Sequence, residues 1–83
     1  MDKVYIIKYI PSGHKPGDVI IDESRFYRTF RSAFNTIIED YMQTIRNYPY
    51  LDIEIDEEHG RAKLIENHKI IEIAYISAVE VID

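Results

Sequence analysis

The residues with the clearest capacity for chemistry are a group of carboxylates in the second half of the chain. Asp52, Glu54 and Asp56 alternate with apolar residues, and Glu57 and Glu58 follow directly. In a β-strand, this alternation places the first three side chains on one face, with neighbours roughly 7 Å apart. Carboxylates at that spacing repel one another, and each is expected to raise the pKa of the next.

Three interpretations of this acidic strand remain open from the sequence. It is the solvated face of a half-buried strand, with Arg61 or Lys63 paired to it across a hairpin. Alternatively, it presents phosphate-like charge to a basic nucleic-acid-binding protein. The third interpretation is a divalent-metal site, but metal ligands usually converge from different elements instead of lying along one strand. We therefore predict neither a metal nor a cofactor.

The histidines and serines form no catalytic motif. His14, His59 and His68 fall in predicted loops and lack the spacing of a helical metal-binding pair. No serine has the GxSxG context of a nucleophile elbow. The loop over 11–18, PSGHKPGD, lacks the spacing of a P-loop. We predict that the protein is not an enzyme, and we keep a small ligand-binding domain or enzyme built on this loop as an alternative.

A basic group precedes the acidic one. Arg25, Arg28 and Arg31 lie at the start of a predicted helix, where the partial positive charge of the helix end disfavours cations. Either acidic groups on the sheet or its loops neutralise these arginines, or they form a docking patch for an acidic partner. We include them, together with the acidic group, among the predicted partner-binding residues.

Length and composition indicate one soluble domain over residues 1–83. The chain has 30% charged and 46% apolar residues, unlike a disordered segment, and it has no cysteine. Its net charge of −5 argues against direct binding to nucleic acid. The apolar stretch near the N-terminus is too short and too charged for a signal peptide or a membrane span. We expect a cytoplasmic protein that does not contact membranes.

One long helix over 24–47 is the element around which we expect the others to pack. Large apolar residues recur there at steps of three and four, which is typical of one helical face. They are Phe26, Phe30, Phe34, Ile37, Tyr41, Ile45 and Tyr48. We expect Asp22 or Ser24 to cap the helix, and Asn47 and Pro49 to end it. In the alternative, residues 25–31 extend the preceding strand and Ser32 caps a shorter helix.

The remaining segments are predicted strands. We expect an internal strand over 4–10, a short edge strand over 19–21, a hairpin of 51–57 with 61–66, and a long strand over 69–82 with a bulge near Ser77. In the hairpin, Leu51, Ile53 and Ile55 are expected to face inward. The fold class is α+β. One long helix packs on a four- to five-stranded, mostly antiparallel sheet in the order β-(β)-α-β-β-β.

These observations lead to a ranked set of functions. In size, charge and residue usage, the chain resembles the short, acidic, cysteine-free accessory proteins carried by bacteriophages and other mobile elements. That resemblance implies a protein that acts by binding another protein. Our leading hypothesis is an inhibitor that presents its acidic surface to a nucleic-acid-binding host protein. The alternative is a homo-oligomeric assembly module, most simply a homodimer formed through strand edges or the helix.

Overall fold

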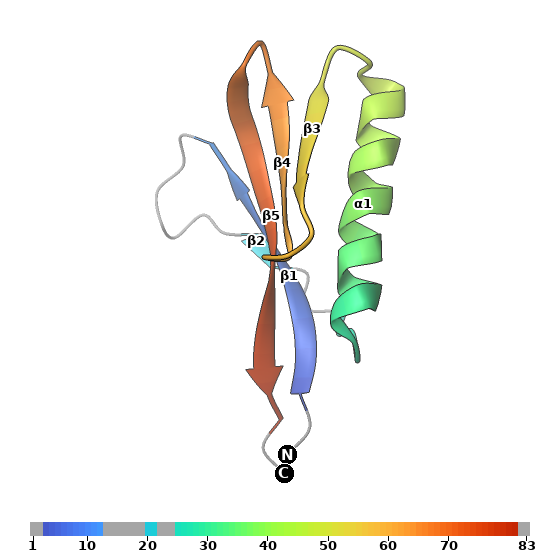
Figure 1. Cartoon of the computed structure of the whole chain (residues 1–83), viewed down its shortest axis with the longest axis vertical. Coiled ribbons are helices and arrows are strands. Elements are labelled where there is room, and N and C mark those ends of the chain that lie inside the picture. Colours follow the sequence, from blue (N-terminus) through green and yellow to red (C-terminus); the bar gives the residue numbers. More distant parts are fainter. Residues whose placement is uncertain (1–2, 13–19, 22–24, 82–83) are drawn as a thin grey trace.

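A computed structural model describes residues 3–12, 20–21 and 25–81, and it confirms the α+β architecture (Figure 1). The elements in chain order are β1 (Lys3–Pro11), β2 (Ile20–Ile21), α1 (Phe30–Asn47), β3 (Asp52–Asp56), β4 (Arg61–Glu66) and β5 (Lys69–Glu80). The five strands form one sheet in the spatial order β2-β1-β5-β4-β3. All neighbouring pairs are antiparallel, and α1 covers one face of the sheet.

The longest pairing joins the first strand to the last. β1 and β5 stay in register from Lys3 opposite Glu80 to Pro11 opposite Glu72, so β1 is an internal strand, as predicted. The sheet is strongly twisted, and the lower halves of β1 and β5 project beyond β3 and β4 (Figure 1). The molecule is elongated in consequence, with principal extents of 45 × 26 × 23 Å.

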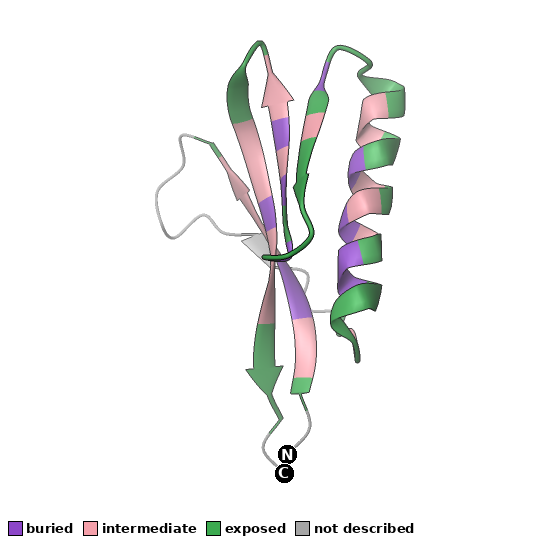
Figure 2. Ribbon diagram, viewed as in Figure 1, coloured by how far each residue is buried: buried purple, intermediate pink, exposed green. Residues whose placement is uncertain are grey.

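The core lies between α1 and the face of the sheet that this helix covers (Figure 2). Each of its other helical members lies three or four residues from Ile37, as the apolar pattern predicted. These members are Ala33, Phe34 and Tyr41. Beneath them, Ala62 and Ala74 are cross-strand partners and are almost fully buried. Their small side chains allow the helix to approach the sheet closely, and Ile37 is fully buried at the contact.

The helix begins later than the predicted start near Ser24. It starts at Phe30, and its cap is Thr29, whose hydroxyl oxygen accepts a hydrogen bond from the Ser32 backbone N–H at 3.0 Å. The predicted caps are therefore wrong, and Asp22 and Ser24 themselves lie outside the described residues. The reason is Tyr27, whose backbone pairs with the edge of β1 at Tyr5 through two hydrogen bonds of 2.7 and 2.9 Å. A residue held in a strand-like bridge cannot also belong to a helix.

Two strand features also differ from expectation. The bulge predicted near Ser77 is wrong, because the β1–β5 register continues past that residue without a break. The irregularity lies between β4 and β5, where Leu64 faces Glu72 but Ile65 faces Ile70, so Ile71 is the extra residue. Ile55 pairs with inward-facing Ala62, yet its side chain remains 50% exposed. β3 is the terminal strand on this side of the sheet, and the helix leaves Ile55 half exposed.

Candidate functional site

The acidic residues gather on the terminal strand of the sheet and on the turn that follows it. We call Asp52, Glu54, Asp56, Glu57 and Glu58 the acidic hairpin. All five side chains are exposed. The residue between the first two, Ile53, packs against the core, so strand alternation directs the three β3 carboxylates away from the helix. The three β3 carboxylates thus share the face away from the helix, whereas Glu57 in the turn contacts Arg31 of α1.

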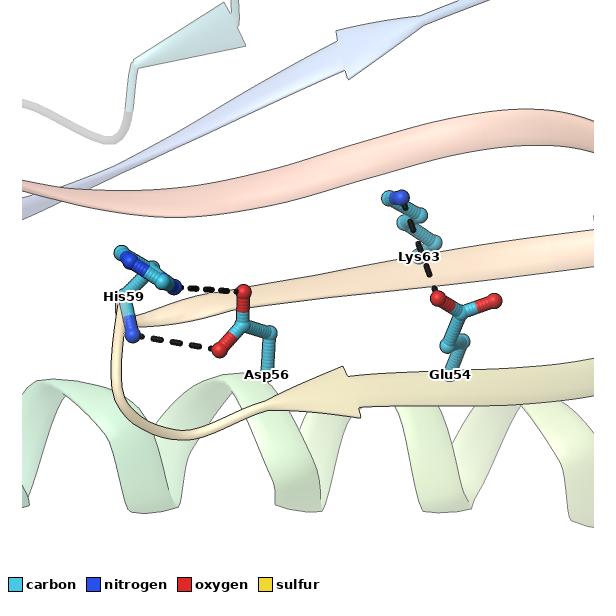
Figure 3. Close-up of polar contacts among 4 residues, drawn as sticks. All are labelled: Glu54, Asp56, His59 and Lys63. Atoms are coloured by element: carbon cyan, nitrogen blue, oxygen red, sulfur yellow. Dashed lines mark hydrogen bonds and ion pairs between the residues drawn. The ribbon is translucent and has the colours of Figure 1, made fainter.

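Part of the acidic hairpin already has partners within the chain (Figure 3). Glu54 lies 3.8 Å from the Lys63 ammonium across the hairpin. Asp56 contacts Nδ1 of His59 at 2.8 Å and accepts a hydrogen bond from the His59 backbone N–H at 3.3 Å. Such exposed pairs contribute only about 0–1 kcal/mol each, so a binding partner can displace them at low cost.

The charge environment of Asp56 differs from the mutual repulsion expected along the strand. Its pKa is lowered, chiefly by the side-chain hydrogen bond with His59 and to a smaller extent by the positive charge of Arg61. Arg61 is the cross-strand partner of Asp56. This carboxylate is therefore held in its charged form.

The acidic hairpin also keeps carboxylates that are not neutralised nearby. Asp52 and Glu58 make no hydrogen bond or ion pair with any other residue that the structure describes. They mark the two ends of the surface, one at the start of β3 and one in the turn. A basic partner would meet these two charges without competition from an internal cation.

The structure separates the three arginines that were predicted to lie together on the helix. Only Arg31 is helical, and its guanidinium lies 2.6 Å from Glu57 Oε1, so the basic and acidic groups meet at this point. Arg28 is exposed and borders an open hollow of about 480 Å³ with Lys3, Val4 and Val81. Arg25 precedes the helix and borders a cavity of about 30 Å³ beside Asp40. They do not form one patch.

Two tyrosine–carboxylate pairs lie between helix and sheet, and sequence reasoning missed both. The Tyr9 hydroxyl donates to Asp40 Oδ2 at 2.7 Å, and the Tyr41 hydroxyl donates to Glu72 Oε1 at 3.1 Å. Burial, reinforced by the neighbouring carboxylates, raises the pKa of each tyrosine. The one signal in the sequence was Glu72, an acidic residue flanked by isoleucines within β5.

The face of the sheet opposite the helix is amphipathic. Strand alternation places Ile10, Ile73 and Tyr75 there, beside Arg61 and Lys63, and these residues line a shallow hollow of about 280 Å³. The Lys8 ammonium lies 5.8 Å from the centre of the Tyr75 ring. Tyr5 and Tyr9 pack beneath the helix, whereas Tyr75 lies on this open face.

The predicted histidine and loop features do not assemble into a site among the residues that the structure describes. His59 contacts Asp56, and His68 lies in the β4–β5 turn with φ of 65°. His14 lies outside the described residues, as do residues 13–18 of the loop over 11–18. No group of three potential metal ligands occurs within 3–12, 20–21 and 25–81. No helix in this part of the structure has the length and apolarity needed to cross a membrane.

Comparison with known proteins does not assign a function. No protein-family model matches the chain, and neither the curated proteins nor the solved structures give a significant match.

Proposed function

We propose that this protein is a non-enzymatic protein-binding module that presents the acidic hairpin to a basic surface of its partner. The observation that carries the proposal is the exposure of all five carboxylates on one terminal strand and its turn. The partner class with the matching chemistry is a nucleic-acid-binding protein, whose basic groove is built to contact a row of phosphates. The protein then acts as an inhibitor by occupying that groove.

The internal ion pairs support this function more than they oppose it. The pairs of Glu54, Asp56 and Glu57 hold three carboxylates in defined positions on the surface. Because surface pairs are weak, arginines and lysines of a partner can replace the internal cations. Asp52 and Glu58 supply the charge that is still uncompensated. Electrostatic complementarity of this kind governs association rate and salt dependence.

The experiment compares the wild-type protein with a variant in which all five carboxylates become amides: Asp52→Asn, Glu54→Gln, Asp56→Asn, Glu57→Gln and Glu58→Gln. Both are used to capture proteins from the native host, and the retained protein is then purified and its binding measured. We expect binding to weaken steeply with salt, to be competed by double-stranded DNA and to be lost in the amide variant. A control variant changes three carboxylates that do not belong to the acidic hairpin: Glu39→Gln, Glu66→Gln and Glu80→Gln.

Retention of the partner by the amide variant, or binding that DNA does not compete, contradicts the proposal. Loss of binding in the control as well would show that net charge matters and the hairpin does not. The homo-oligomeric assembly module remains the second candidate function, and one observation favours it: the described residues leave the sheet face opposite the helix uncovered.

A further inference from the structure

The lower half of β5 has a partner strand on one side only. β1 pairs with it along its whole length, but β4 begins at Arg61, opposite Tyr75. The last contact on the β4 side is the hydrogen bond from the Ile76 N–H to the Gly60 carbonyl, at 3.1 Å. Beyond Ile76, no described residue pairs with this edge, and Figure 1 shows the strand projecting there with β1 alone beside it.

The backbone groups that face this edge can be identified. Ile76 directs its N–H toward the β4 side, and alternate residues of a strand direct their N–H and C=O groups to the same side. Ala78 and Glu80 therefore present theirs to the open edge. Odd-numbered residues face the other way, as the bond from the Ser12 N–H to the Ile71 carbonyl confirms.

We propose that this edge pairs with the same edge of a second copy of the chain, in an antiparallel, two-fold symmetric register centred on Val79. Ala78 then exchanges two backbone hydrogen bonds with Glu80 of the second copy, and the symmetry repeats the exchange. Val79 faces its own counterpart in the close, non-hydrogen-bonded position. Val4 is the cross-strand neighbour of Val79, so the two copies form a continuous row of four valines.

Charge and existing contacts select this register among its neighbours. Centring on Ala78 would require Ile76 to give up its bond to Gly60. Centring on Glu80 would place two glutamates directly opposite one another, which is destabilising. The chosen register avoids both conflicts and covers Val79 and Val81, which are 40% and 39% exposed in the single chain.

The same reasoning rejects the open edge of β3. Self-pairing of β3 centred on Glu54 would bring Asp52 opposite Asp56 of the second copy, and Glu54 opposite itself. Like charges in these positions oppose pairing, and charged side chains are a common protection for edge strands. β5 carries no such protection between Ser77 and Val79. The edge is short, so we expect a weak dimer that dissociates on dilution.

The first test is sedimentation equilibrium over a wide concentration range. We expect the wild-type protein to associate as its concentration rises, and Val79→Glu to stay monomeric because two carboxylates would meet on the symmetry axis. Met42→Glu adds the same charge at an exposed helical position and should associate like the wild type. A wild type that remains monomeric throughout, or association that survives Val79→Glu, overturns the proposal.

The second test uses the absence of cysteine from the chain. In the proposed register the Cα atoms of the two Val79 residues lie about 4.5 Å apart, within reach of a disulfide. The two Val81 residues lie roughly 13 Å apart, four residues out of register. Under mild oxidation, Val79→Cys should therefore form a covalent dimer and Val81→Cys should not. Equal crosslinking of the two variants overturns the register. Neither test involves the acidic hairpin, so the two proposals can fail separately.

Discussion

Two phenol groups, Tyr41 buried and Tyr9 partly buried, provide the polar contacts between helix and sheet at the scale of single residues. Tyr9 and Tyr41 both donate hydrogen bonds to carboxylates, and their rings lie 6.3 Å apart. Each pair joins helix and sheet: Asp40 and Tyr41 belong to α1, while Tyr9 and Glu72 belong to β1 and β5. The two pairs therefore provide hydrogen-bond partners for these polar side chains in the region between helix and sheet, where most of the apolar core also lies.

Tyr41→Phe should lower the free energy of unfolding by about 1–3 kcal/mol near pH 7, because Glu72 loses a donor at a part-buried site. The folded pKa of Tyr41 is raised above the unfolded value of 10.0. The stability linked to this group is therefore complete below pH 10 and is lost as the pH rises above it. Urea unfolding at several pH values should show that the free energy of unfolding falls less above pH 10 in Tyr41→Phe than in the wild type.

Tyr48→Phe is the matched control for this experiment, since the Tyr48 side chain is 52% exposed and makes no hydrogen bond with another described side chain. It should follow the wild type at every pH. If the free energy of unfolding falls equally with rising pH in Tyr41→Phe and the wild type, ionisation of the Tyr41 phenol does not cause the loss of stability.

At the scale of elements, the β3–β4 turn meets the first turn of the helix. Gly60 is buried with φ of +61°, and a Cβ at this position would lie 2.6 Å from Phe30 Cε2. The Phe30 ring stacks on Phe34 at 6.2 Å and contacts the edge of Tyr5 at 6.3 Å. The start of the helix, the turn and β1 thus meet at a single aromatic cluster.

Gly60→Ala should therefore destabilise the protein for two reasons. The left-handed backbone costs a non-glycine residue about 1–2 kcal/mol, and the new methyl group would displace the Phe30 ring. A double-mutant cycle with Phe30→Ala separates the two terms. We expect Gly60→Ala to cost less when Phe30 is already alanine, as measured by urea unfolding. If the destabilisations of Gly60→Ala and Phe30→Ala simply add in the double mutant, the Phe30 ring accommodates the new methyl group without an energetic penalty.

The sequence predicted elements well and their tertiary relations poorly. Periodicity predicted α1 and the strands, and the intervals between the predicted strands marked the two turns, where Gly60 and Asn67 have positive φ. The preferred helix start was wrong because Phe26 continues the apolar stripe while the backbone of Tyr27 pairs with β1, and the alternative of a shorter helix capped at Ser32 came closer to the observed start at Phe30. The composition and exposure of the acidic hairpin followed from strand alternation. Its contact with Arg31 did not, since the two residues meet only after the helix docks.

The molecule as a whole is a two-layer structure with a small core on one side of its sheet. The helix-covered side holds the fully buried residues, whereas the other side carries shallow hollows, among them the one around Ile73 and Tyr75. A chain of 83 residues buries a limited fraction of its surface. Stability should therefore depend on a few side chains at the contact between helix and sheet.

Ile37→Ala tests this dependence, because the Ile37 side chain of α1 is fully buried between the helix and the sheet. We expect it to cost about 2–5 kcal/mol of unfolding free energy, a large part of the total for a small domain. Ile55→Ala makes the same change at a side chain that is 50% exposed, and it should cost about 1 kcal/mol or less. Urea unfolding of both variants gives the comparison. Similar costs would contradict a core confined to the helix contact.

The pairing of the first strand with the last has a consequence for the order of events during synthesis. β1 is made first, but its long partner, β5, is made after every other element. Until then, β1 has only β2 and Tyr27 beside it, and β4 has only β3. These two halves join into one sheet only through β5. Because contacts so distant in sequence close late, the native sheet should form only after β5 has been synthesised.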